Sequence, residues 1–155
     1  MLESGADAPT FTLSDQSGSE VDLAGYRGRW MLLWWYPEAG SSGCSVQVAS
    51  LRSARDLLDA ASLAVVGISY NSVEQNNAFS CDYDLGFPLL SDPNQVCAEA
   101  YGVRREPGEP YADKPHRMSF LIDPGGTVAF AEAVPHDAVH GYADRVLHQL
   151  ASVRG

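Results

Sequence analysis

The stretch Trp30-Met-Leu-Leu-Trp-Trp-Tyr36, continued by Pro37-Glu-Ala-Gly-Ser-Ser-Gly-Cys44, decides the fold of this chain. Seven consecutive apolar or aromatic residues that stop at a proline predict a strand buried on both faces. The segment from Ser45 onward predicts a helix that ends near Ala60. Its apolar face is expected to carry Val46, Ala49, Leu57 and Leu58. Cys44 therefore lies where a buried strand passes into a helix.

The position of Cys44 has a chemical consequence. The first turn of a helix has free backbone N–H groups and the positive end of the helix dipole, and both favour a thiolate, the nucleophilic form, over a thiol. Ser41 lies three residues earlier, so its hydroxyl is expected to reach the sulfur or an oxygen bound to it. Gly40 and Gly43 permit close approach of the backbone, which is useful where N–H groups must face an oxyanion.

Strands and helices alternate along the rest of the chain. We expect a hairpin at 8–23, a buried strand at 63–69, a helix at 71–84, an extended segment at 87–93, a short helix at 94–101, a loop at 104–115, a hairpin at 118–131 and a final helix at 137–150. This order predicts an α/β fold, with a mixed central sheet flanked by helices, in a single domain covering residues 1–155.

The net charge and the cysteine count limit which partners and which cell compartment are expected. The formal net charge of −10, from 10 Lys+Arg against 20 Asp+Glu, argues against nucleic acid or an anionic membrane as a partner. The chain starts without the basic and apolar regions of a signal peptide, and no apolar run reaches the length of a bilayer span. Three cysteines do not make a disulfide framework, so we expect a cytoplasmic protein in which a paired cysteine is catalytic.

Two segments resemble the peroxiredoxins, the thiol peroxidases built on a thioredoxin-like fold. The spacing Pro37-x-x-x-Ser41-x-x-Cys44 resembles their Pro-x-x-x-Thr/Ser-x-x-Cys motif, and the segment that starts at His116-Arg117 resembles the strand whose leading arginine points at the active-site cysteine. Further segments look like the Q-type branch, also called bacterioferritin comigratory proteins. These are Ala8–Leu13, Phe87–Pro93, Ala100–Val103 and Ser119–Asp123. The resemblance covers nearly the whole chain.

The resemblance implies a direct mechanism. Cys44 would attack hydrogen peroxide or an organic hydroperoxide and become a sulfenic acid. Arg117 and Ser41 would hold the peroxide, and Pro37 would shield the sulfenate. Thioredoxin or a similar dithiol would return the enzyme to its reduced form. No metal or organic cofactor is required, and a monomer is expected.

The chain departs from the family pattern at two places. Ser41-Ser42-Gly43-Cys44 replaces the common Thr-Pro-Gly-Cys, which keeps the hydroxyl but loosens the turn. Ala49 stands where many Q-type members carry the resolving cysteine on the same helix. Some members place that cysteine on the helix after the second central strand, which favours Cys81. Cys97 falls on the buried face of a short helix and is a weaker candidate, and an external thiol is the third possibility.

Three other functions are compatible with parts of this sequence. A thiol–disulfide oxidoreductase normally uses Cys-x-x-Cys, and position 41 is a serine. A pathway-specific oxidase on the same fold would fit the altered motif, the missing resolving cysteine at position 49 and the proline-rich loop at 104–115. A one-cysteine redox sensor would be oxidised at Cys44 without catalytic turnover. His136 and His140 have the spacing of paired metal ligands on a helix, with His148 as the nearest third ligand, but surface histidines are the favoured interpretation.

Overall fold

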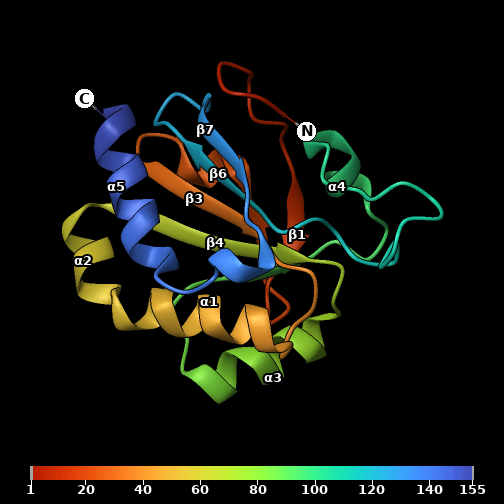
Figure 1. Cartoon of the computed structure of the whole chain (residues 1–155). Coiled ribbons are helices and arrows are strands. Elements are labelled where there is room, and N and C mark those ends of the chain that lie inside the picture. Colours follow the sequence, from red (N-terminus) through yellow and green to blue (C-terminus); the bar gives the residue numbers. More distant parts are fainter. Residues whose placement is uncertain (1, 155) are drawn as a thin grey trace.

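The computed structural model describes residues 2–154, and its centre is one seven-stranded sheet (Figure 1). The strand order is β2-β1-β5-β4-β3-β6-β7. The strands are β1 (Thr12–Ser14), β2 (Glu20–Asp22), β3 (Trp30–Trp35), β4 (Leu63–Ser69), β5 (Leu89–Ser91), β6 (Met118–Ile122) and β7 (Val128–Ala133). β3, β4 and β5 run parallel, while the outer strands pair antiparallel. The predicted mixed sheet flanked by helices is confirmed.

Helices cover both faces of this sheet (Figure 1). One face carries α1 (Ser42–Ser53), α2 (Arg55–Ala60), α3 (Val73–Tyr83) and α5 (Tyr142–Arg154), and the other carries α4 (Val96–Tyr101). Short 3-10 turns are η1 (Leu23–Tyr26) and η2 (His136–Ala138). The 104–115 loop contains no helix or strand, as predicted. No helix within residues 2–154 is long and apolar enough to cross a bilayer.

Alternation along β3 divides the hydrophobic core in two. Leu32, Trp34 and Tyr36 pack with the helices that follow β3, whereas Met31, Leu33 and Trp35 pack with α4 on the opposite face. The seven-residue apolar run is therefore buried on both sides, as its composition predicts. The Trp34 ring fits because its neighbour on β4 is Gly67, where a Cβ atom would lie 3.0 Å from that ring.

The helix after β3 differs from its prediction in start, continuity and buried face. It begins at Ser42 rather than Ser45, because Ser41 caps it, and it breaks at Ala54 into α1 and α2. The buried apolar side chains include Cys44, Val48, Leu51 and, as predicted, Leu58, whereas Ala49 and Leu57 are exposed and Val46 is half-buried. The earlier start moves Cys44 into the first helical turn.

The final helix also begins later than predicted. η2 covers His136–Ala138, and Gly141 has φ +67°, so α5 starts only at Tyr142. A left-handed residue interrupts α-helical geometry, which explains the break. His136 and His140 consequently do not share an α-helix, so their spacing does not place them on one helical face as a pair of metal ligands. Within residues 2–154 no three histidine, cysteine or acidic side chains group into a metal site.

Candidate active site

The candidate site lies at one edge of the sheet, where four strand ends meet. β3 and β4 run parallel, with Trp35 opposite Ile68, so their carboxyl ends share this edge. β6 begins there because Met118 pairs with Trp35, and β7 ends there because Ala133 pairs with Met118. The register thus brings together the segments that follow β3, β4 and β7 and the one that precedes β6.

Cys44 lies in the first turn of α1, and its side chain is fully buried. Arg117, immediately before β6, donates a hydrogen bond from Nη1 to Cys44 Sγ at 3.4 Å. Ser41 is the N-cap residue of α1, and its Oγ accepts a hydrogen bond from the Cys44 N–H at 3.4 Å. The guanidinium and the helix N-terminus both place positive charge beside the sulfur. The structure therefore brings together three of the side chains singled out in the sequence.

Gln47 is a site residue that the sequence analysis missed. It follows Cys44 by one turn of α1 and is fully buried, and its Oε1 accepts a hydrogen bond from Arg117 Nη1. Its Nε2 is buried without a hydrogen-bond partner among the described residues. A polar residue three positions after the cysteine, on the buried face of a helix, was the available signal. Gln47 and Cys44 together fix the position of the Arg117 guanidinium.

Gly43 leaves the space that the guanidinium occupies. A Cβ atom at this position would lie 2.7 Å from Arg117 Nη2 and 3.1 Å from the ring of His136. Both distances are shorter than ordinary contacts, so a side chain here would displace the arginine. The close approach expected at Gly43 is thus present, and the group that approaches is Arg117.

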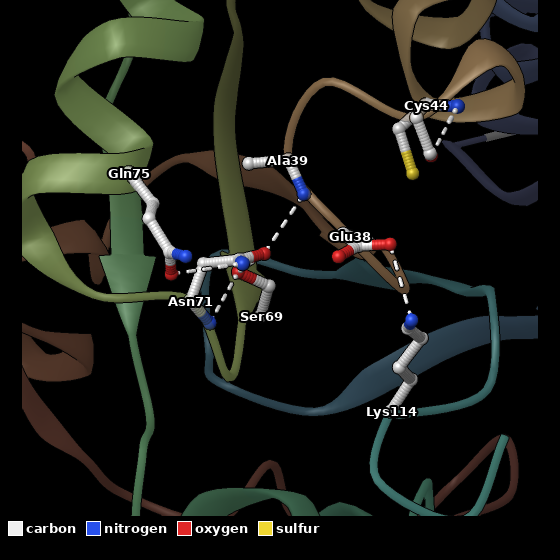
Figure 2. A network of polar contacts seen from close by, with 8 residues as sticks. Glu38, Ala39, Cys44, Ser69, Asn71, Gln75 and Lys114 are labelled. Atoms are coloured by element: carbon white, nitrogen blue, oxygen red, sulfur yellow. Dashed lines mark hydrogen bonds and ion pairs between the residues drawn. The ribbon is translucent and has the colours of Figure 1, made fainter.

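Asn71 anchors the turn between β3 and α1 (Figure 2). Its Oδ1 accepts hydrogen bonds from the Ala39 N–H at 2.8 Å and from Ser69 Oγ at 3.1 Å, and its Nδ2 donates to Gln75 Oε1 at 3.1 Å. Gln75 in turn completes a capping box with Ser72 at the start of α3. The turn that leads from β3 to α1, and so to Cys44, is therefore hydrogen-bonded to the end of β4 and to α3.

Two buried tyrosines adjoin the site without adding charge to it. Tyr36 donates a hydrogen bond to Asn76 Oδ1 at 2.6 Å, and Tyr142 shares a hydrogen bond with Ser119. Burial raises the pKa of Tyr36 and the pKa of Tyr142 well above the ordinary value, so both phenols stay neutral. Arg117 is therefore the side chain that brings charge to Cys44, in addition to the partial positive charge at the N-terminus of α1.

A cleft of about 610 Å³ opens at this edge of the sheet. Its lining includes Pro37, Ser41, Gly43 and Arg117, with Pro135 and His136 from the segment after β7 and Arg105, Tyr111, Lys114 and His116 from the loop after α4. Lys114 Nζ lies 3.1 Å from Glu38 Oε2, and this ion pair joins the 104–115 loop to the turn before Cys44 (Figure 2).

Cys81 and Cys97 have different surroundings, and all three cysteines are free. Cys81 is exposed near the end of α3. Cys97 is buried on α4, on the face of the sheet opposite Cys44. Burial raises the pKa of the Cys97 thiol, and the neighbouring Asp92 carboxylate raises it further. The structure therefore places Cys97 away from the site and keeps it a thiol.

Comparison with known proteins points to one family. The AhpC/TSA family model matches residues 4–131. A peroxiredoxin Bcp relative from Haemophilus influenzae is 40% identical over 130 residues, which are 82% of this chain and 83% of the relative. Peroxiredoxin Bcp of Escherichia coli is 38% identical over 146 residues, 89% of this chain and 93% of the relative.

Solved structures agree with the sequence relatives. Peroxidoxin BcpB from Mycobacterium tuberculosis superposes with a TM-score of 0.87 at 25% identity, over 100% of both chains. A bacterioferritin comigratory protein from Xanthomonas campestris, described for its alkyl peroxide reduction activity, has a TM-score of 0.82 at 27% identity and covers 92% of this chain and 90% of its own. The predicted thioredoxin-like fold is confirmed.

Proposed function

The chain belongs to the AhpC/TSA family and is a peroxiredoxin of the Bcp/Q type, a thiol-dependent peroxidase, and from this premise we propose that Cys44 is its peroxidatic cysteine. The observation that carries this assignment is the 3.4 Å contact between Arg117 Nη1 and Cys44 Sγ. A thiolate beside a fixed guanidinium, at the N-terminus of a helix, is an activated nucleophile.

In the first step the Cys44 thiolate attacks the terminal oxygen of R–O–O–H. The S–O bond forms as the O–O bond breaks, and the departing RO⁻ takes a proton and leaves as water or alcohol. Cys44 becomes a sulfenic acid. Arg117 and the Ser41 hydroxyl stabilise the negative charge that develops on the departing oxygen, and Pro37 limits access of water to the sulfenate.

We assign Cys81 as the resolving cysteine. Its thiolate would attack the sulfenic sulfur, form a Cys44–Cys81 disulfide and release water. Cys44 is fully buried whereas Cys81 is exposed, so this step requires local unwinding. The end of α3 is capped, because the Leu85 N–H donates to the Ser80 carbonyl at 3.1 Å and Arg55 Nη2 donates to the Asp84 carbonyl at 2.7 Å, so unwinding must break these hydrogen bonds before Cys81 can reach Cys44.

Peroxiredoxins of this family use peroxide substrates and thioredoxin-type reductants. We propose that this enzyme acts on hydrogen peroxide and organic hydroperoxides and is recycled by thioredoxin or a similar dithiol. Such a reductant requires a reducing compartment, for which the cytoplasm is our proposal. One chain supplies every side chain assigned to the site, which is compatible with a monomer.

The test begins with reduced protein and one equivalent of hydrogen peroxide, with dimedone in a parallel sample, followed by intact mass and a non-reducing peptide map. We expect the loss of two hydrogen atoms, a linked Cys44–Cys81 peptide, and a dimedone adduct on Cys44 in the parallel sample. Cys44→Ser should abolish peroxide reduction. Cys81→Ser should keep the first turnover and lose the linked peptide, while Cys97→Ser serves as the matched control and behaves as wild type.

Two outcomes would overturn parts of this assignment. A dimedone adduct on Cys44 without a linked peptide would remove Cys81 from the mechanism and identify a one-cysteine enzyme that uses an external thiol or a dedicated partner. An unreacted Cys44 would refute its peroxidatic role.

A further inference from the structure

The cleft beside Cys44 is much larger than hydrogen peroxide requires. Its volume of about 610 Å³ lies within the range of ordinary small-molecule sites. Two oxygen atoms occupy roughly the volume of two waters, about 60 Å³. The remaining space can hold an organic substituent on the peroxide, and the charges that line it indicate which kind of substituent is favoured.

Most of the positive charge in the cleft already has a partner. Lys114 is paired with Glu38, and Arg117 is engaged by Cys44 and Gln47. These groups therefore offer little net attraction to a distant part of the substrate.

Arg105 differs from these side chains. It is half-buried, its Nε is buried without a hydrogen-bond partner, and no ion pair among the described residues includes it. Burial lowers the pKa of the adjacent His116, and Arg105 lowers it further, so that imidazole is neutral near pH 7 and cannot share the role. An uncompensated guanidinium is notable in a chain of net charge −10, because the overall field repels anions.

We propose that Arg105 binds a carboxylate carried by the organic substituent of the hydroperoxide, while Arg117 and Cys44 act on the peroxide end. The guanidinium fork matches a carboxylate with two parallel hydrogen bonds, and partial burial strengthens them. This proposal rests on the proposed function and adds a preference for anionic substrates to it.

The chemical step itself is unchanged. The S–O bond still forms at Cys44 as the O–O bond breaks, and the product alcohol leaves with its carboxylate released from Arg105. Arg105 does not touch the reacting atoms, so it determines specificity rather than catalysis. It should raise kcat/KM for carboxylate-bearing peroxides and leave neutral peroxides unaffected.

The test uses tertiary alkyl hydroperoxides that carry a terminal carboxylate on chains of increasing length, each compared with its methyl ester. At the best length, wild type should prefer the carboxylate in kcat/KM by about 10- to 100-fold, the range of a hydrogen-bonded charge pair. Arg105→Gln should remove this preference, and it should leave the values for the esters and for tert-butyl hydroperoxide unchanged.

Arg104→Gln is the matched control. Arg104 is the preceding residue and carries the same charge, but it pairs with Glu99 and Gln95 and does not line the cleft. It should keep the wild-type preference. Equal values for carboxylate and ester at every length in wild type, or a preference that survives in Arg105→Gln, would overturn the proposal while the peroxidase assignment stands. Failure of wild type to reduce any hydroperoxide would instead overturn the assigned function.

Discussion

Replacing Gly43 with alanine tests whether the position of the Arg117 guanidinium limits the first chemical step. The new Cβ would lie 2.7 Å from Arg117 Nη2, whereas an unstrained contact needs about 3.5 Å or more. The guanidinium must therefore move by about 1 Å, and its hydrogen bond to Cys44 Sγ, now 3.4 Å, lengthens beyond a useful distance.

The expected effect on rate is large and the effect on stability is small. A misplacement of about 1 Å in a group that stabilises developing charge costs about 100-fold, or about 2.7 kcal/mol in the barrier. Gly43 lies inside α1, where alanine is favoured over glycine by up to about 1 kcal/mol. Activity and stability should therefore change independently.

The assay is single-turnover oxidation by hydrogen peroxide, paired with denaturant unfolding of the same samples. Gly86→Ala is the control, because its Cβ would make an ordinary contact of 3.5 Å with Arg55, far from the cysteine in the lining of a separate groove. An oxidation rate for Gly43→Ala within threefold of wild type would refute the reasoning. A loss of rate that tracks a loss of folded protein would refute it too.

Three further predictions address the scaffold and the thiols. Asn71→Ala removes the acceptor for the Ala39 N–H and should lower the free energy of unfolding by about 1–3 kcal/mol in urea titrations, with a lower oxidation rate; unchanged values would remove its anchoring role. In reduced protein at pH 8, iodoacetamide should label Cys81 while Cys97 stays unlabelled, because burial raises the pKa of Cys97, and mass spectrometry that finds equal labelling would contradict this. Gly67→Ala would place its Cβ 2.8 Å from the side chain of Leu89 and should lower the free energy of unfolding by about 1–3 kcal/mol, measured as a lower Tm. An unchanged Tm would contradict this, because it would mean that the core relaxes around the new methyl group.

Local sequence patterns predicted the elements whose structure depends on local residues. β3 and β4 were predicted correctly. A strand that is buried on both faces needs a continuous run of apolar or β-branched residues, and such a run can be recognised in the sequence alone. The predicted start of α1, Ser45, was wrong. Gly43 has low helix propensity and argued against a helical first turn, but Ser41 caps a helix that begins at Ser42. Ala49 was expected on the buried face, but that face carries Cys44, Val48 and Leu51, and Ala49 lies five residues after Cys44, about 140° around the helix, where it is exposed.

In the candidate site, too, the residues that belong to local motifs were predicted, and those that depend on contacts between distant segments were missed. Cys44, Ser41 and Arg117 were predicted because the first two belong to one short motif and the third leads a recognisable strand. Gln47 and Asn71 were missed because their contacts join distant segments: Gln47 meets an arginine 70 positions away, and Asn71 meets a backbone N–H 32 positions away. Strand register creates such contacts, and no single window of sequence contains them.

The division of the core by β3 also governs how oxidation spreads within the molecule. Cys44 lies among the side chains of one sheet face and Cys97 among those of the other, with a continuous hydrogen-bonded sheet between them. A sulfenic acid on Cys44 would condense with any thiol that reached it, and the sheet keeps the Cys97 thiol out of its reach. The sheet separates the two sulfur atoms, so Cys97 is expected to stay a thiol for as long as the sheet is folded.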